Sequence, residues 1–395
     1  MTRLSRSLWL APLLLSIAAC PGSGPSKFGA VLPLTGEAAV YGTSIQKGID
    51  LALEQIRREP ETPKIELVVK DSGSDPERAK RALEELYGNG AVAVIGGVTS
   101  AEALAMVPIA DHQDRILLSP SASLPQLSGI SSNFYRIFPS DFAEGTVMAK
   151  YAFDTLHLKT AVILAKQETY AKGIQEVFSD EFRRKGGQVL EQIDFPANTS
   201  DFAALTDRAA TLKPDCVYLA AYAEEIADLI QELRDHQYVG TILTTSSFAA
   251  ATTIATTGAA AEGVLFTQSA FDVQGNLPDQ VKAFVTAYRA KYKADPDLYS
   301  AHGYDALRIL VEAVRQGGKN ASSFWKGLRN IADYPGVTGV IHFDEKGDVQ
   351  KFPRVYYVVE GRAVDREQER QRQLEDARAK ILEIERQLRE MKQGN

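Results

Sequence analysis

The sequence predicts an α/β protein with more than one parallel sheet, on the strength of two observations. From Lys27 onward, short apolar runs alternate with segments of helical periodicity, which is typical of strands joined by covering helices. These runs are more numerous than a single sheet of ordinary size holds. The chain has 395 residues, 45% hydrophobic and 24% charged, and is long enough for two cores. We therefore expect a folded globular protein, neither disordered nor membrane-spanning.

The same periodicity places the elements in order. Strands are expected at residues 28–32, 65–69, 91–95, 116–118, 161–165, 189–193, 216–220, 242–244, 264–267 and 355–359. Helices are expected at residues 44–57, 76–87, 142–156, 174–185, 224–236, 278–293 and 304–315, and another opens at Thr99-Ser100. Because Pro108 lies inside that last pattern, we expect this helix to kink or end near it.

Small polar residues follow two neighbouring strands of the expected first sheet. The run 91–95 leads through two glycines to Ser100, and the run 116–118 ends in Ser-Pro-Ser-Ala-Ser at residues 119–123. Open α/β sheets bind ligands at the carboxyl ends of such strands, and a helix N-terminus there suits a carboxylate. We expect Ser100 and Ser123 to bind this anion. The alternative is that Ser100 caps its helix and that the later serines are turn residues.

The N-terminal residues are typical of an export signal. Two arginines precede an apolar run at residues 8–17, and small residues precede Cys20. Residues 17–20, Ile-Ala-Ala-Cys, resemble the bacterial lipobox, in which the cysteine is acylated and becomes the mature N-terminus. Several acyl chains give stable membrane attachment, so we expect lipid on Cys20 rather than a plain signal peptide with a chance cysteine. Residues 21–26 would be a flexible tether, and Cys216 is expected to be buried in a strand without a disulfide.

A series of short motifs extends along most of the chain, from about Phe28 to Val359. They are Leu34-Thr35-Gly36, Tyr41-Gly42, Gly97-Val98-Thr99-Ser100, the serine-rich residues 118–123, Tyr135-Arg136-Ile137, Pro139-Ser140-Asp141, Ala261-Glu262-Gly263 and Gly303-Tyr304-Asp305-Ala306. No single motif is specific, but their order and spacing together are. In this series the chain resembles the substrate-binding proteins of branched-chain amino acid transporters, which have the type I periplasmic binding fold.

This resemblance implies two Rossmann-like lobes with parallel sheets, three crossovers and a ligand cleft between the lobes. Lobe 1 would comprise residues 27–141 and 269–340, and lobe 2 residues 142–268 and 341–364, after a signal peptide at 1–19 and a tether at 20–26. The crossings would lie near residues 138–141, 267–270 and 339–343. Hinge bending at these crossings is expected to close the lobes over a ligand.

The resemblance also implies a set of ligand-binding residues: Tyr41, Ser100, Ser121, Ala122, Ser123, Tyr170, Tyr222 and Ser246. For each tyrosine the alternative is a half-buried residue with its hydroxyl at the surface.

Ser246 departs from the pattern of relatives that bind α-amino acids, which have an acidic residue there to pair with the ammonium group. Burying an ammonium without a carboxylate is costly. Either Glu168, Glu224 or Glu225 supplies the charge, or the ligand is not an α-amino acid. Ser100 and Ser123, which are expected to bind the anionic end of the ligand, still favour a carboxylate.

Catalysis, metal binding and nucleic-acid binding find no support in the sequence. The motifs of metalloproteases, serine hydrolases and P-loop enzymes are absent, and the five histidines lack ligand spacing. Asp71 and Asp75 could suggest a metal pair, but Asp75 begins an Asp-Pro-Glu helix start. A net charge of −7 without a basic stripe argues against nucleic acid. We expect no enzyme activity, no cofactor and no metal.

The C-terminal residues 365–395 form a charged segment. Within it, apolar residues recur at alternating spacings of three and four, typical of a heptad seam: Leu374, Ala377, Ile381, Ile384, Leu388 and Met391. The alternatives are a solvated or fraying helix, self-association through a coiled coil, and docking to another envelope protein.

Two functions remain. In both, the protein lies in the bacterial cell envelope, facing the periplasm or at the outer surface, and is attached through lipid on Cys20. In the first, a receptor captures an amino acid or other small carboxylate and delivers it to an ABC permease. In the second, the lobes form a regulatory lipoprotein, like the activators of penicillin-binding proteins, some of which contain this fold. The C-terminal segment lends weight to the second.

Overall fold

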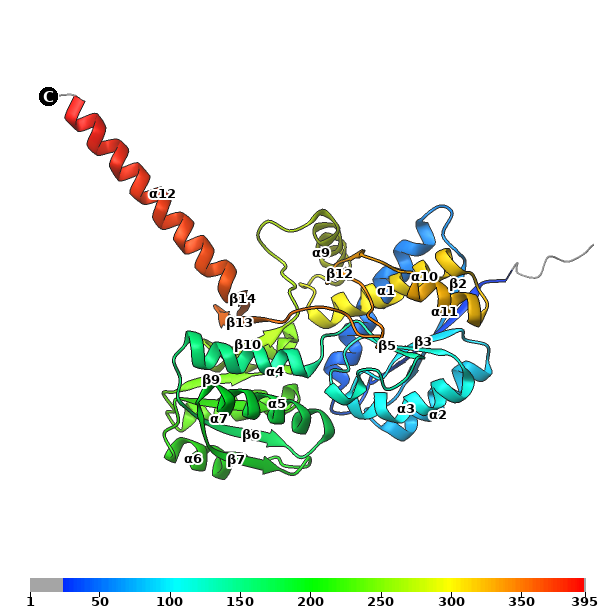
Figure 1. Cartoon of the computed structure of the whole chain (residues 1–395), viewed down its shortest axis with the longest axis horizontal. Helices are drawn as coiled ribbons and strands as arrows, with labels where there is room; N and C mark the ends of the chain where they lie inside the picture. Colours follow the sequence, from blue (N-terminus) through cyan, green and yellow to red (C-terminus); the bar gives the residue numbers. More distant parts are fainter. Residues whose placement is uncertain (1–23, 394–395) are drawn as a thin grey trace, which may run out of the picture.

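The computed structural model describes residues 24–393, which form two α/β lobes side by side (Figure 1). The first lobe contains a parallel five-stranded sheet in the order β2-β1-β3-β4-β5. Its strands are β1 (Ser26–Leu32), β2 (Ile65–Asp71), β3 (Ala93–Gly96), β4 (Ile116–Ser119) and β5 (Phe134–Arg136). The residues of β3 and β4 are all buried, as expected for parallel strands covered by helices on both faces.

The second lobe contains a seven-stranded sheet in the order β14-β13-β10-β9-β8-β6-β7. Its parallel part comprises β6 (Thr160–Lys166), β7 (Gln188–Phe195), β8 (Cys216–Ala220), β9 (Thr241–Thr244) and β10 (Leu265–Gln268). An antiparallel hairpin of β13 (Arg354–Val359) and β14 (Arg362–Asp365) extends it beyond β10. A separate two-stranded ribbon pairs β11 (Tyr334–Gly336) with β12 (Gly339–Ile341). The prediction that Cys216 is buried in a strand is confirmed.

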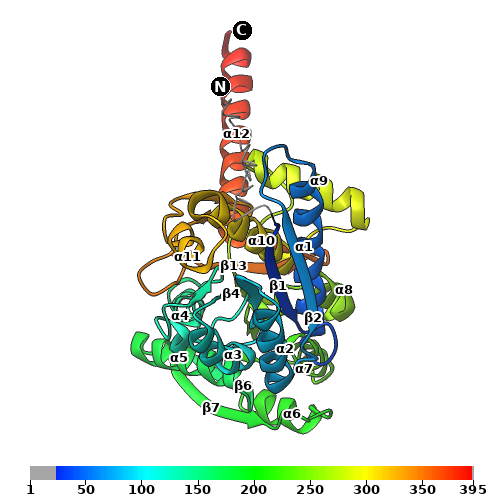
Figure 2. The same cartoon turned by 90° about the vertical axis from the view of Figure 1, so that its right-hand side faces the viewer.

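Helices cover both faces of the first sheet. On one face lie α1 (Ala39–Arg58), α10 (Leu298–Gly317) and α11 (Ala321–Arg329), and on the other α2 (Pro76–Gly88) and α3 (Ser100–Gln113), as Figures 1 and 2 show. The helix α9 (Asp279–Tyr292) is the first helix after the chain returns from the second lobe, and it belongs to neither of these two helix layers. The second sheet is packed by α4 (Asp141–Lys150) with α5 (Thr169–Lys185), and by α6 (Ala203–Thr211), α7 (Ala223–Asp235) and α8 (Ala251–Thr257).

The chain passes between the sheets three times in the described residues: after β5, after β10, and between β12 and β13. The lobe boundaries drawn from the sequence stay a prediction. The signal peptide, Cys20 and most of the tether lie outside the described residues.

Several helix boundaries differ from expectation. The first helix begins at Ala39, five residues before the expected start, so that Tyr41 belongs to its first turn. Likewise, α5 begins at Thr169 and α10 at Leu298, five and six residues before their expected starts. The helix after β3 does not end near Pro108 but continues to Gln113. Proline removes one backbone donor there, yet the buried face of α3 against the sheet outweighs this loss. The expected helix 142–156 is α4 followed by a π turn at Tyr151–Thr155.

Close packing of α1 on α10 depends on two glycines. A Cβ atom at Gly48 would overlap the carbonyl oxygen of Ser300, and one at Gly303 would overlap that of Ile45. Without these Cβ atoms the two helix backbones approach closely. The helices thereby bring Tyr41 of α1 and Tyr299 of α10 together, with ring centroids 4.7 Å apart.

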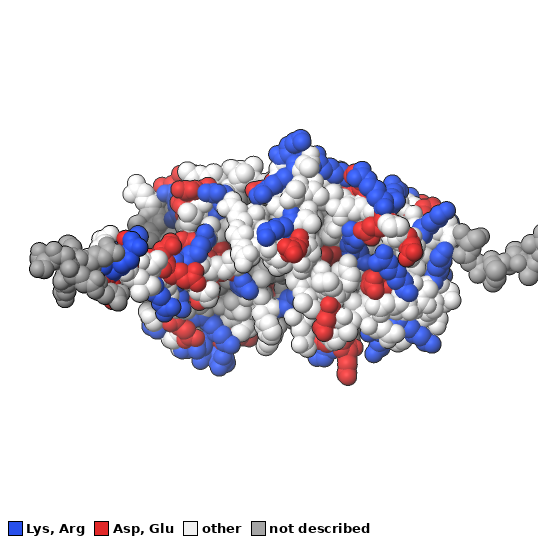
Figure 3. Space-filling model, turned by 90° about the horizontal axis from the view of Figure 1, so that it is seen from above, with Lys and Arg blue, Asp and Glu red and all other residues white. Residues whose placement is uncertain are grey.

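The last helix, α12 (Arg366–Gln393), projects away from both lobes (Figure 1). No described helix is long and apolar enough to cross a membrane. On the face shown in Figure 3, Lys and Arg are interspersed with Asp and Glu. This mixture agrees with the absence of a basic stripe in the sequence.

Candidate functional site

A small cavity lies between the lobes, at the carboxyl ends of both sets of parallel strands. The cavity is lined by Tyr41, Val98, Thr99, Ser100, Ser121, Ser123, Phe138, Tyr170, Tyr222, Ser246, Ser247 and Tyr299. Of the residues predicted from the sequence, Ala122 alone is not in this lining; it packs in the first-lobe core with α2 and α3.

Thr99, rather than Ser100, caps α3. The Thr99 hydroxyl accepts from Glu102 N at 3.2 Å, and the Glu102 carboxylate accepts from Thr99 N at 3.1 Å, which is a capping box. The alternative that Ser100 caps the helix is therefore wrong. The capping box leaves the N–H groups of Ser100 and Ala101 available, because the first turn of a helix has no internal acceptors for them. Positive potential at this helix end favours an anion.

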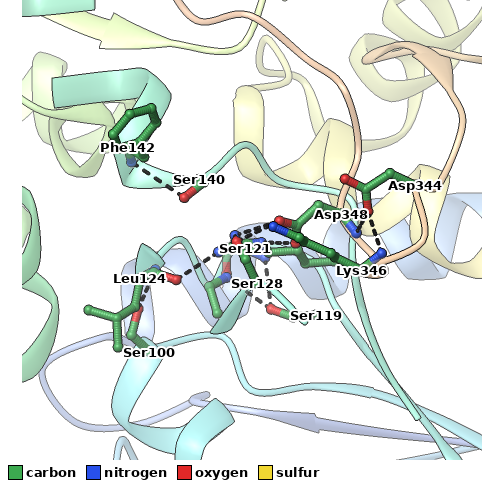
Figure 4. Close-up of polar contacts among 12 residues, drawn as sticks. Ser100, Ser119, Ser121, Leu124, Ser128, Ser140, Phe142, Asp344, Lys346 and Asp348 are labelled. Atoms are coloured by element: carbon green, nitrogen blue, oxygen red, sulfur yellow. Dashed lines mark hydrogen bonds and ion pairs between the residues drawn. The ribbon is translucent and has the colours of Figure 1, made fainter. Parts of the chain in front are cut away.

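The serine loop, residues 119–123 after β4, is held against the turn that follows β3 (Figure 4). Ser119 Oγ donates to Gly97 O at 2.8 Å and accepts from Ala122 N at 2.9 Å. Ser121 Oγ donates to Val98 O at 2.7 Å. These bonds position Ser123, which is buried and lines the cavity next to Ser100.

Three tyrosines line the cavity, and one of them, Tyr41, links the lobes by hydrogen bonds. The Tyr41 hydroxyl donates to Ser247 O at 3.1 Å and accepts from Ala223 N at 2.8 Å, so it joins first-lobe α1 to the second lobe. Tyr170 and Tyr222 stack with their centroids 5.8 Å apart. All three are at most 5% exposed, and burial raises the pKa of each hydroxyl, which stays neutral. The alternative of half-buried tyrosines with surface hydroxyls is wrong.

Sequence reasoning did not include five of the lining residues in the site: Val98, Thr99, Phe138, Ser247 and Tyr299. Tyr299 donates to Ser246 O at 3.0 Å, and its ring stacks on Phe138 at 6.2 Å. Phe138 precedes the Pro139-Ser140-Asp141 motif, which was a signal that could have identified it. Tyr299 has no local signal, because the packing of α10 on α1 places it.

None of the three acids suggested as partners of an ammonium lines the cavity. Glu168 caps α5 by accepting from Tyr170 N at 3.0 Å, and it also accepts from the Tyr222 hydroxyl at 3.1 Å. Glu224 is exposed in the first turn of α7. Glu225 is paired with Lys166, whose buried ammonium also contacts first-lobe Glu37 at 2.8 Å. Lys166 therefore bridges the lobes and neutralises Glu225.

A different acid lies behind Ser246. Glu144, on α4, accepts from Ser246 N at 2.6 Å, from Ser246 Oγ at 2.9 Å and from Thr267 Oγ1 at 2.9 Å. Burial raises the pKa of Glu144 to about 7, against the opposing effect of these hydrogen bonds.

The arrangement matches a known family. A model described as periplasmic binding protein matches residues 25–366, which covers both sheets and every cavity-lining residue. The chain belongs to the periplasmic binding protein family.

Relatives within this family agree in name and in fold. A Leu/Ile/Val-binding protein of Rhizobium johnstonii is 26% identical over 346 residues, which cover 86% of this chain and 93% of the relative. A leucine-binding protein from Thermotoga maritima has a TM-score of 0.81 and 29% identity, covering 86% of this chain and 97% of its own. A branched-chain amino acid substrate-binding protein from Streptococcus pneumoniae, solved with isoleucine, has a TM-score of 0.81, 26% identity and coverage of 86% and 98%.

The predicted resemblance and the type I periplasmic binding fold are thus confirmed. These periplasmic binding proteins are named for the solutes they bind rather than for a reaction. Membership of the family implies an extracytoplasmic location and favours the receptor over the envelope regulator.

Proposed function

We propose that this periplasmic binding protein is a lipid-anchored receptor that holds an amino acid or another small carboxylate in the interlobe cavity and delivers it to an ABC permease. One observation supports this most directly: two first-lobe serines at a helix N-terminus and a strand end line the same interlobe cavity as two second-lobe tyrosines. The serines suit the anionic end of a solute. The tyrosines offer a neutral aromatic surface for the rest of the solute.

A ligand screen tests this function. A solute that binds only the folded protein at 100 times its Kd stabilises it by about 2.7 kcal/mol, so the unfolding temperature should rise. We expect at least one member of a panel of amino acids and small organic acids to raise it in a thermal-shift assay. If no member of the panel does so, the receptor function proposed here is wrong.

Attachment through Cys20 rests on the lipobox-like sequence alone. We expect Cys20→Ala protein, once exported, to move from the membrane fraction to the soluble fraction, because it loses its acyl chains. Cys216→Ala protein should remain with the membrane, as the matched control. Equal membrane binding of the Cys20 variant and the wild type would show that the anchor lies elsewhere.

We also propose that α12 associates with α12 of a second copy. It contacts the body only at its start, where Arg366 Nε bonds the Tyr151 hydroxyl at 3.3 Å and Gln368 Nε2 bonds Asp272 at 2.8 Å. Every residue from Arg370 to Gln387 is exposed, including large apolar side chains that are each more than half exposed: Leu374, Ile381 and Ile384.

The charges beside this seam favour a parallel pair. With Ile381 at a heptad a position and Ile384 at d, Lys380 takes g and Glu385 takes the following e. In a parallel coiled coil these two positions meet across the pair with opposite charge. A parallel pair also suits two copies attached to one membrane by their N-terminal ends.

Removing the tail should therefore reduce the size of the protein in solution. We expect the soluble chain truncated after Gln371 to sediment as a smaller species than the full chain. The decrease in mass should be larger than the mass of the removed residues. The substitution Ile381→Lys should have the same effect, and Ala379→Lys, on the outer face of the helix, should not. Monomers of both the full chain and the truncation would contradict self-association.

A further inference from the structure

A lysine beside the cavity forms an ion pair between the lobes. Lys166 is the last residue of β6, and its side chain is 0% exposed. Its ammonium contacts Glu37 of the first lobe at 2.8 Å and also contacts Glu225 of the second lobe. In the described part of the chain, every other ion pair lies within one lobe, within α12, or between β5 and the third crossing. The contact between Lys166 and Glu37 is therefore the ion pair that forms or breaks as the two lobes approach or separate.

This ion pair adjoins the tyrosines of the cavity. The Lys166 ammonium is 5.0 Å from the centre of the Tyr222 ring, and that ring lies 6.1 Å from the ring of first-lobe Tyr41. Glu37 is in the loop before α1, four residues ahead of Tyr41. Because Glu37 and Tyr41 belong to the same lobe and are close along the chain, a movement that separates Tyr41 from Tyr222 also separates Glu37 from Lys166.

Lys166 carries its charge although no part of its side chain is exposed. Burial lowers the pKa of the ammonium, but the carboxylates of Glu225 and Glu37 raise it by more, so the pKa lies above its ordinary value. Lys166 is therefore a cation at pH 7. A buried cation without a counter-charge is strongly destabilising. Two carboxylates supply this counter-charge, one from each lobe.

The two carboxylates behave differently when the lobes separate. Glu225 is in the first turn of α7, in the same lobe as Lys166, and its side chain is 14% exposed, so it stays with the ammonium. The side chain of Glu37 is 48% exposed and moves away with the first lobe, where water solvates it. Neither charge is then left buried without a partner. The contact with Glu37 thus favours the closed form, and Glu225 allows it to break without the cost of an unpaired buried charge.

We infer that Lys166 and Glu37 form an electrostatic latch that holds the cavity closed, with Glu225 as the counter-charge that keeps Lys166 paired while the latch is open. The latch goes beyond the proposed receptor function, because it controls how often the cavity opens whichever solute binds there. Since Glu37 is half exposed, dissolved salt screens its attraction to Lys166 and should favour the open form. The bonds of the Tyr41 hydroxyl across the lobes join neutral groups and should respond to salt much less.

The distance between the lobes in the empty protein tests the latch without any ligand. Spin labels on Gln113→Cys of α3 and Thr211→Cys of α6, both at exposed positions, report this distance by double electron–electron resonance. The full soluble chain beginning at Pro21 is used, in which Cys216 is buried and protected from the label. An excess of unlabelled chain removes distances between copies that associate through α12. At low salt we expect the native latch to give mainly the shorter distance of the closed form.

Changing the charge of Glu37 should open the lobes. Glu37→Gln should raise the open-to-closed ratio by about fivefold or more at low salt, because the closed form loses an ionic contact. Glu37→Lys places a cation against Lys166 and should raise the ratio further. Adding 1 M KCl should raise the ratio in the chain with the native latch and change it little in Glu37→Gln. Glu77→Gln, which removes an exposed acid paired with Lys80 inside the first lobe, is the matched control and should leave the ratio unchanged. Unfolding temperatures establish that each variant folds.

The outcomes separate the latch from the receptor function. If Glu37→Gln and Glu77→Gln give the same open-to-closed ratio, or if the chain with the native pair is already open at low salt, the latch is wrong. Neither result bears on the receptor, which the ligand screen tests. A salt-dependent ratio that changes with Glu37 and not with the control supports the latch, even if the screen identifies no solute.

Discussion

Replacing Asp348 by Ala should lower the free energy of unfolding by about 3–5 kcal/mol, because it leaves a buried guanidinium without its counter-charge. The Arg136 side chain is 0% exposed, and it donates to both Asp348 oxygens, at 2.7 Å and 3.1 Å. Its remaining donors bond Leu124 O at 3.0 Å and Ser128 Oγ at 2.7 Å.

This ion pair also matters for the cavity. Asp348 belongs to the segment by which the chain crosses from β12 to β13, and Figure 4 shows residues 344–348 beside the serine loop. The pair therefore ties the third crossing to the loop that carries Ser123. We expect Asp348→Ala to weaken ligand binding as well as stability.

Urea unfolding monitored by circular dichroism provides the measurement. The matched control is Glu360→Ala, which removes an exposed ion pair to Arg362 and should cost at most about 1 kcal/mol. If Asp348→Ala lowers the free energy of unfolding no more than the control does, the Arg136–Asp348 pair does not stabilise the contact between the third crossing and the serine loop.

Ser123→Ala should weaken binding of the ligand by about 1.5–3 kcal/mol, roughly tenfold or more, by removing a charge-assisted hydrogen bond to its carboxylate. Ser100→Ala should have a similar effect. Because Thr99 caps α3, the Ser100 substitution removes no cap, but it removes the buried bond that Ser100 Oγ accepts from Leu124 N at 3.3 Å, so the stability of the empty protein must be measured beside the affinity. The loss of affinity can then be assigned to the ligand.

Calorimetry with the strongest ligand from the thermal-shift screen measures both variants. Ser322→Ala, an exposed serine outside the cavity, is the control and should bind like wild type. Thr99→Ala should lose about 1 kcal/mol of stability with the cap, which Ser100→Ala retains. Unchanged affinity in both cavity variants would mean that these serines are not the recognition site.

Much of the site could be predicted because its first-lobe half follows from local rules. An apolar strand that ends in glycine, a capped helix and a serine-rich loop after the next strand must meet at one edge of a parallel sheet. Ser100, Ser121 and Ser123 were placed together on that basis. The side chain of Ala122 packs in the first-lobe core, so its role in ligand binding stays a prediction. The three tyrosines needed the family resemblance as well.

Short and weakly periodic elements were missed. The strand β14 has four residues and α6 has nine, and neither offers a window in which a period of two or 3.6 is distinct. By contrast, the charged segment expected at residues 365–395 forms α12 at Arg366–Gln393, because 28 residues without Gly or Pro, most of them helix formers, leave little alternative.

By itself, then, the sequence determined the alternation of strands and helices, the meeting of Ser100 and Ser123 at one sheet edge and the C-terminal helix, since each depends on residues close together in the chain. Only the tertiary structure decided which acid lies behind Ser246. Glu144 reaches it across 102 residues, and Tyr299 reaches Ser246 through the close packing of α10 on α1. Hydrogen bonds between side chains on different elements depend on how helices cross a sheet and how two lobes close, and no local periodicity encodes either.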